Sequence, residues 1–375
     1  MKTGLFLILL LVIHLNTLAQ KLPGAFDELR LLEFNKELPK DLLSTRSAVF
    51  ITVPDKKGKL PQRGDWQLLA REAHEGFKRI GIDAVAYLNL QDVNAGLDAI
   101  DGFIVPINNR DIENLIFLSL KEGLLGTEIE LVITKRPSEG SLLNLHQPAY
   151  RISRNAIGEI IAQLGRDIYQ VQLQNHNFMI LDQPEFFSDA YVVKGRRFES
   201  FNSDLKIGKL AVPKFEKFKF PPKVDSASVS SDKLSLINQY NALVENANQE
   251  LLALMAIYPY KYELVDYSVG EEHLYRQEFS YVLMSLNSTG INIKNLLNYT
   301  VDPNETDYLS LKTIAEGVTT LEQIPVNTPV FKYYMKQLVN KEIYLGKQWD
   351  ADLTWQQALT NYLNNFKDAM EEKNK

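Results

Sequence analysis

The chain has 375 residues, of which 45% are hydrophobic and 23% are charged, and its formal net charge is −6. This composition is ordinary for a globular protein, and the length predicts two or three domains. The acidic balance argues against nucleic acid as a partner and gives no support to binding at an anionic membrane surface. The chain has no cysteine, which excludes disulfides, thiolate nucleophiles and cysteine-ligated zinc or iron–sulfur sites.

The start of the chain, residues 1–19, has the layout of a secretory signal peptide. Lys2 provides a positive start, residues 5–13 form an unbroken apolar run, and Ala19 is a small residue at the expected cleavage site. A permanent anchor needs about 20 apolar residues, but His14 and Asn16 interrupt this run. We therefore predict cleavage after Ala19, a periplasmic or secreted mature chain, and no membrane span after cleavage.

Strand and helix patterns alternate through the next part of the chain. We predict strands at 47–53, 84–90, 102–107, 128–134 and 149–153. We predict helices at 65–80, where Asp65 can serve as the cap, at 111–121, and at 157–168. This alternation is typical of an α/β fold in which helices cover a sheet.

The order of these elements is similar to that of the N-terminal α/β domain of the Tol-system propeller protein and of penicillin-binding-protein activator lipoproteins. The likeness is carried by the strand at 47–53, the helix at 65–80, the strand pair near 128–153 and the closing helix after Asn155. Those families act in envelope assembly and partner binding, so the resemblance implies a binding role rather than catalysis. This chain lacks the lipidated cysteine of the lipoproteins.

A loosening of the pattern between 170 and 222 separates this region from a second one. The serine-rich stretch 225–232 predicts a linker. We therefore expect two α/β modules, an N-terminal domain at 20–224 and a C-terminal domain at 233–375 that ends in a helix.

The second region begins with a predicted helix from about residue 231 that Pro259 ends. Strands are predicted at 260–267 and 279–286, and the segment between them forms either a short helix or part of a plain hairpin. Residues 295–326 are predicted to be mostly loop. Thr354 and Gln357 have the spacing of a capping box at the start of the last helix.

A basic loop before the helix at 65–80 is the most suggestive binding motif. Free backbone N–H groups at a helix start attract anions. The candidate anion-binding residues are Lys56, Lys57, Lys59 and Arg63. A phosphate-binding loop would have lysine and then serine or threonine after its second glycine, whereas Asp65 follows Gly64 here. The alternative is a solvated surface loop.

Tyrosines gather in the second region, and exposed tyrosines make good contact surface for proteins or glycans. The candidate partner-binding residues are Tyr260, Tyr262 and Tyr267. The alternative, which alternating aromatic residues favour, is that they pack a second core with their hydroxyls at its rim.

Motifs for chemistry are missing from the sequence. No histidine pair has the spacing of a helical zinc site, and no serine lies in a nucleophile elbow. We therefore predict no metal and no cofactor. The leading hypothesis is a non-catalytic exported envelope protein that binds a protein or a glycan. The alternative is a secreted hydrolase with dispersed carboxylates, for which Asp92 and Asp101 are the acids to examine.

Overall fold

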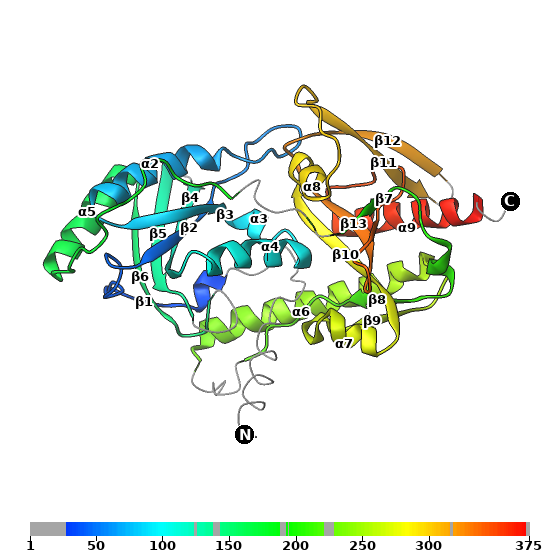
Figure 1. Ribbon diagram of the computed structural model, residues 1–375, viewed down its shortest axis with the longest axis horizontal. Coiled ribbons are helices and arrows are strands. Elements are labelled where there is room, and N and C mark those ends of the chain that lie inside the picture. The colour runs from blue at the N-terminus through cyan, green and yellow to red at the C-terminus, as the bar shows by residue number, and fades with distance from the viewer. Residues whose placement is uncertain are drawn as a thin grey trace, which may run out of the picture.

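Two six-stranded mixed sheets and a separate two-stranded ribbon form the framework of this α/β protein (Figure 1). The structure, a computed structural model, describes residues 28–123, 126–137, 143–187, 193, 195–220, 229–315 and 318–372. Within these ranges, no helix has both the length and the apolar character needed to cross a bilayer.

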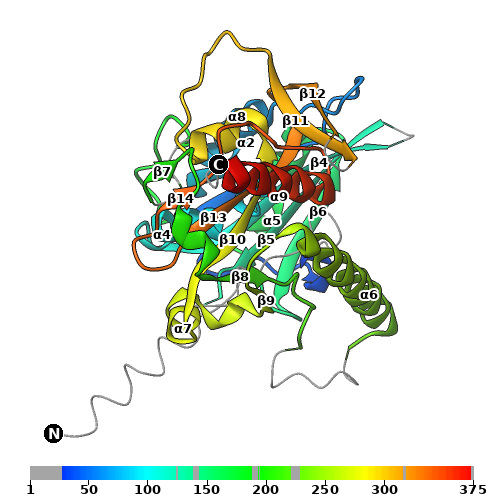
Figure 2. The ribbon, with the colours of Figure 1, turned by 90° about the vertical axis from the view of Figure 1, so that its right-hand side faces the viewer.

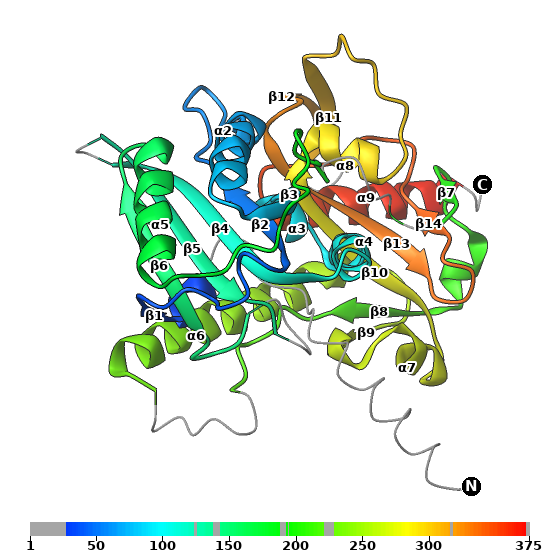
Figure 3. The same cartoon turned by 60° about the vertical axis from the view of Figure 1, so that its left-hand side comes forward.

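Sheet 1 has the strand order β1-β6-β5-β4-β2-β3. Its strands are β1 (Glu33–Asn35), β2 (Arg46–Thr52), β3 (Asp83–Asn89), β4 (Ile112–Gly123), β5 (Gly126–Lys135) and β6 (Pro148–Arg154). The outer face packs against α2 (Trp66–Arg79) and α5 (Ile157–Gln170), which lie in front of the strands in Figure 3. The inner face packs against α3 (Leu90–Val93) and α4 (Leu97–Asn108).

Sheet 2 has the strand order β7-β14-β13-β10-β8-β9. Its strands are β7 (Arg197–Phe198), β8 (Lys209–Pro213), β9 (Tyr262–Val265), β10 (Phe279–Thr289), β13 (Pro329–Gln337) and β14 (Ile343–Tyr344). The outer face packs against α6 (Ser231–Leu254) and α9 (Trp355–Glu372), and Figure 2 looks onto α9. The inner face carries α7 (Glu271–Arg276) and α8 (Gly290–Leu296). The ribbon consists of β11 (Asp307–Ala315) and β12 (Val318–Pro325).

The two sheets repeat one another in strand order and in strand direction. Numbered in chain order within each sheet, the strands run 1-6-5-4-2-3 in both. In both, only the fifth strand is antiparallel to its neighbours, and all other neighbouring strands are parallel. We call residues 33–170 the first half and residues 197–372 the second half.

The helices follow the same repeat. In both halves a helix on the outer face joins the second and third strands, and another outer helix follows the sixth. The face assignment also repeats, because Ala48 and Ala211 face the inner core while Val49 and Val212 face the outer cores. The segment from α8 to β12 is present only in the second half, between its fourth and fifth strands.

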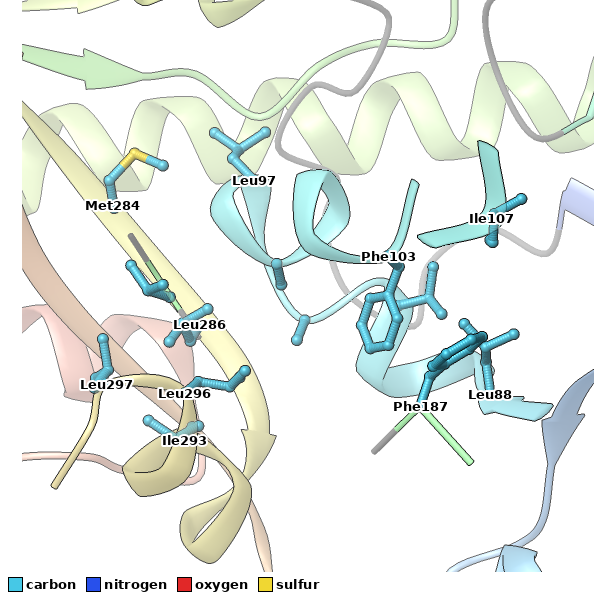
Figure 4. Close-up of a cluster of buried hydrophobic side chains, with 14 of the residues drawn as sticks. Leu88, Leu97, Phe103, Ile107, Phe187, Met284, Leu286, Ile293, Leu296 and Leu297 are labelled. Atoms are coloured by element: carbon cyan, nitrogen blue, oxygen red, sulfur yellow. The ribbon is translucent and has the colours of Figure 1, made fainter. Parts of the chain in front are cut away.

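One hydrophobic core joins the inner faces of both sheets (Figure 4). Phe103 of α4 lies beside Leu88 and Phe187, whereas Met284 and Leu286 of β10 lie on the other side of the helix. Near α4 the backbones approach so closely that a Cβ at Gly96 would lie 2.2 Å from the carbonyl oxygen of Ser285. The halves therefore share one interior. We call the surface where α3 and α4 meet β10 and β13 the joint.

Two predicted elements in the first half are wrong in type. Residues 102–107 belong to the helix α4 rather than to a strand, and 111–121 belong to the strand β4 rather than to a helix. β4 is central and buried on both faces, with Leu115 facing the inner core and Ile116 the outer core. A strand that is apolar on both faces loses its alternation, and α4 lies between two sheets, so periodicity could not separate the two cases.

The predicted loop at 295–326 is also wrong, because it contains β11 and β12. Pro303 lies before the ribbon and Pro325 ends it, so neither proline interrupts a strand. The strand–helix–strand alternative for 260–286 is confirmed, since β8 lies between β9 and β10 and excludes a hairpin.

The division into domains at 225–232 stays a prediction, because the described residues include only 229–232 of that stretch. The sheets place β7 and β8, which precede it in the chain, together with the later strands.

Candidate functional site

A first polar cluster at the joint brings together the two halves. An Nη of Arg63 donates to Oδ1 of Asp92, and Ser288 Oγ of β10 donates to the same oxygen at 2.7 Å. Asn292 of α8 then donates to Ser288 Oγ at 2.8 Å. The Arg63 and Asp92 side chains are only 9% and 8% exposed. A charge pair this enclosed fixes the position of the loop before α2 against the second half.

A second cluster lies farther along the joint and is built around Lys336 of β13. Its ammonium donates to Asp98 of α4 at 2.5 Å and to Glu271 of α7 at 2.8 Å. The Tyr334 hydroxyl donates to the other oxygen of Asp98 at 2.6 Å. Burial together with the charge of Asp98 raises the pKa of Tyr334 well above its ordinary value. Tyr334 therefore remains a neutral donor.

Glu271 closes the second cluster on the side nearest to solvent. Its carboxylate also accepts from the hydroxyl of Tyr267 at 2.7 Å and from the ammonium of Lys341. Burial alone would raise the pKa of Glu271, but the charge of Lys336 and these hydrogen bonds outweigh it and lower the pKa to about 2. Glu271 is thus a stable anion that holds α7 against β13.

In both clusters the carboxylates are enclosed and engaged by neighbouring cations and hydroxyls. This is the arrangement of a structural ion-pair network rather than of an open catalytic site. Asp92, one of the two acids examined for hydrolysis, has its carboxylate held by Arg63 and Ser288. Asp101 lies on α4, and its side chain is outside the part of the chain that the structure describes. Among the described residues, no group of three or more histidine and acidic side chains is placed to hold a metal ion.

The loop with the predicted anion-binding residues is divided by the fold. Lys56, Lys57 and Lys59 are exposed, whereas Arg63 is held by Asp92 at the joint. The helix start is also occupied, because the Asp65 carboxylate accepts from the backbone N–H groups of residues 67 and 68 at 3.1 and 3.2 Å. The anion-binding hypothesis stays a prediction, and it now depends on the three lysines.

The three predicted partner-binding tyrosines do not form one surface. Tyr260 and Tyr262 pack around Tyr258, and Tyr260 also meets Phe366 of α9, all on the outer face of sheet 2. Tyr267 lies against the inner core instead and donates to Glu271. All three are half-buried. This arrangement matches the packing alternative, with the side chains at the rim of a core.

A segment that sequence analysis did not select has the clearest features of a binding surface. Residues 168–181 contain no aspartate, glutamate, lysine or arginine, in a chain that is 23% charged. Five of their large apolar side chains are more than half exposed: Tyr169, Val171, Phe178, Met179 and Leu181. Phe178 and Met179 reach 81% and 92%. We call residues 168–181 the apolar segment.

The apolar segment is held in place by polar contacts at several points. The backbone N–H of His176 donates to the carbonyl of Leu43 at 2.8 Å, and the Asn177 amide donates to the carbonyl of Gly81 at 3.1 Å. The carbonyl of Leu181 lies 2.9 Å from Nε2 of His74, which is buried in α2. The exposed side chains are therefore presented from a fixed backbone.

A hollow adjoins the start of the apolar segment, between the ends of α2 and α5. It is lined by Ile80, Gly165, Ile168, Tyr169, Gln170, Gln172 and Leu173. Its lining mixes aliphatic side chains with uncharged amides, which is the composition of a site for an apolar group with a few polar contacts. The signal in the sequence was the run of 14 residues without charge, not a spacing motif.

Comparison with known proteins gives no assignment. No protein-family model matches the chain, no curated protein is similar to it, and no solved structure matches it.

Proposed function

We propose that this chain is an exported, non-catalytic protein that binds a protein partner on its apolar segment. The carrying observation is the exposure of five large apolar side chains on a stretch without charge. Exposed apolar patches on a folded protein mark interaction sites more often than single exposed residues do.

The chemistry of the segment favours a polypeptide over other partners. Tyr169, Phe178 and Met179 are residue types that are enriched in the centres of protein–protein interfaces. The neighbouring residues are the uncharged amides Gln170 and Gln172, which offer hydrogen bonds without the cations that phosphate groups require. A partner with an apolar, uncharged surface is therefore expected.

The fixed backbone also favours binding. Association loses free energy when mobile loops must be ordered. Here the contacts of His176, Asn177 and Leu181 already hold the segment. The partner would meet a surface whose conformation is set before contact.

The test compares a double serine variant in the apolar segment with a single serine variant at an exposed residue of the second half. Phe178→Ser with Met179→Ser removes the most exposed part of the segment, whereas Ile207→Ser changes a residue of the second half that is also 81% exposed. Envelope proteins retained by the wild-type chain are identified, purified and titrated against each variant. We expect binding to weaken by about tenfold or more in the double variant, as for interface hot spots, and to be unchanged in Ile207→Ser. Equal binding by all three would contradict the proposal.

Export is a separate part of the proposal, and it depends on the leader sequence. Residues 1–19 lie outside the described residues. Amino-terminal sequencing of the protein from fractionated cells should give Gln20 as the first residue, in the periplasm or the medium. Full-length chain in the cytoplasm would contradict it.

A further inference from the structure

We propose that two copies of this chain associate through β12, each extending the ribbon of the other. The observation lies in the second half and does not depend on the apolar segment. In the described residues, β12 pairs with no strand other than β11, and beyond that pairing its backbone bonds only at its end, where the Pro325 carbonyl accepts from the Thr328 N–H at 2.9 Å. The opposite edge of the ribbon is in use, because the Leu311 N–H donates to the carbonyl of Trp349 at 2.7 Å. Alternate N–H and C=O groups of β12 therefore point away from the ribbon without a strand partner.

The other sheet edges in the described residues are protected, and this sets β12 apart. The edge of β3 is covered, since Tyr87 exchanges backbone hydrogen bonds of 2.9 and 3.0 Å with residues 185 and 187. β1 and β7 are only three and two residues long. β9 carries Glu263, which pairs with Lys209 at 2.6 Å. Short strands, charges and covering segments are the usual ways in which proteins prevent edge pairing.

β12 has none of these protections along most of its length. It is eight residues long, its one charged residue is Glu322, and its one proline is its last residue, Pro325. The outward face of the ribbon carries exposed leucines, Leu309 at 62% and Leu321 at 63%, beside the uncharged Thr319 and Gln323. An exposed edge with an apolar face is a template for the addition of another strand.

A second copy of β12 fits this edge in the antiparallel direction. If the two strands pair symmetrically about Leu321, then Leu321 faces Leu321 of the other copy, and Thr319 faces Gln323. Glu322 then faces Thr320 and not the other Glu322, so no like charges are opposed. Glu322 already pairs with Lys312 of its own chain at 2.8 Å. The charges along β12 therefore allow it to pair with β12 of a second copy.

Pairing would also enlarge a small sheet. The ribbon is held against α9, where the Thr313 N–H donates to Oδ1 of Asn361 at 2.7 Å, and further strands with an apolar face would stabilise it more. Two copies would form one four-stranded sheet whose face carries Leu309, Leu311 and Leu321 from each chain, since Leu311 and Leu321 are partners in the ribbon. The interface would be isologous and closed, as in most homodimers.

Sedimentation velocity tests the pairing on the purified chain. We expect twice the mass of a single chain for the wild type, and loss of the dimer in Leu321→Lys, because an edge lysine blocks strand addition. Leu252→Lys on α6 is the control, since Leu252 is 53% exposed and remote from the ribbon in sequence; it should remain dimeric. Circular dichroism of the Leu321→Lys variant should match the wild type. A wild-type chain that stays monomeric at submillimolar concentration, or a dimer that survives Leu321→Lys, would overturn the proposal.

The absence of native cysteine allows a second readout of the register. Leu321→Cys introduces the one thiol of the chain, and directly opposed residues in antiparallel strands are close enough for a disulfide. Mild oxidation should convert this variant to a covalent dimer, and Leu252→Cys should stay monomeric on a denaturing gel. Covalent dimer from Leu252→Cys but not from Leu321→Cys would overturn the pairing.

Discussion

The two halves of this chain share a strand order, but about half of their exposed large apolar side chains lie in two short stretches, the apolar segment that begins at the end of α5 and the ribbon. The first half continues after its closing helix α5 into the apolar segment, whereas the second half ends with α9, whose apolar residues Leu359, Tyr362 and Phe366 are fully buried. The second half instead adds the ribbon. Nine of the 17 exposed large apolar residues in the described ranges lie in residues 168–181 and 309–321.

This difference separates the residues that make the fold from the residues available for binding. The repeated strands and helices bury their apolar side chains in three large cores. The polar groups at the joint are likewise paired across the two halves, through Asp92 and Asp98 of the segment that lies between the sheets.

The largest effect is expected from Asp98→Ala at the joint. This change leaves Lys336 buried with Glu271 alone and removes the acceptor of Tyr334. Breaking a buried ion pair by removing one partner costs about 3–5 kcal/mol, and urea denaturation should show a loss of this size. Asp182→Ala, which breaks an exposed pair with Lys78, is the control and should change stability little. Similar losses of stability in both variants would mean that the ion pair at the joint is no more enclosed than the exposed pair of Asp182 and Lys78.

A dependence on acid pH should follow from Glu271. Its pKa is lowered from 4.5 to about 2 in the folded chain, so its ionised form stabilises the fold above about pH 4.5. This contribution, about 3 kcal/mol by linkage, is lost as the pH falls from 4.5 toward 2. In Glu271→Gln, the unfolding free energy should be lower at neutral pH and should fall less steeply over that interval. An unchanged slope would show that Glu271 is not held by Lys336.

A smaller effect is expected where the backbones of the halves approach. Gly96→Ala would place a methyl group 2.2 Å from the Ser285 carbonyl oxygen, and the forced shift should cost about 1–3 kcal/mol. Gly158→Ala is the matched control, because a Cβ at Gly158 meets no atom within 4 Å. Since Gly158 lies in α5, alanine there should raise stability by about 0.5–1 kcal/mol. Thermal denaturation should therefore show a lower melting temperature for Gly96→Ala and a higher one for Gly158→Ala. Melting temperatures that shift in the same direction would contradict the close packing of the two halves at Gly96.

The smallest effects should come from the starts of the corresponding helices α5 and α9. The Gln357 N–H donates to Thr354 Oγ1 at 3.3 Å, whereas Ala156 before α5 has no side-chain cap. Thr354→Ala should lower the free energy of unfolding by about 1 kcal/mol, and Ala156→Ser should raise it by a similar amount. Chemical denaturation of both variants checks this, and no gain from serine would mean that α5 is limited by something other than its cap.

The sequence predicted those elements whose pattern has a single interpretation. The helices α2 and α5 have one apolar face, and β5 and β6 are bounded by turn residues, so these were found close to their observed positions. β4 and α4 are enclosed by other elements, and a segment buried on both sides has no periodicity to read. The capping box was half right, because the Gln357 side chain donates to the Thr313 carbonyl at 2.7 Å and not to Thr354.

Less of the site could be predicted than of the fold. Arg63 and Asp92 were both selected, but their pairing joins residues 29 positions apart and includes Ser288 from the other half. Such contacts follow from the docking of the sheets, which no local pattern encodes. The apolar segment could have been found from its lack of charge. The repeat could not have been found from the sequence, because it consists of strand order and strand direction, which are properties of the assembled sheets.

The most direct measurement is site-specific photo-crosslinking in cells that produce the full chain. A photoreactive residue at Phe178 should give a discrete adduct with one other protein, and the same residue at Ile207, which has the same exposed fraction of 81%, should give none. That outcome would place partner binding on the apolar segment. No adduct at position 178, or the same adducts at both positions, would contradict it.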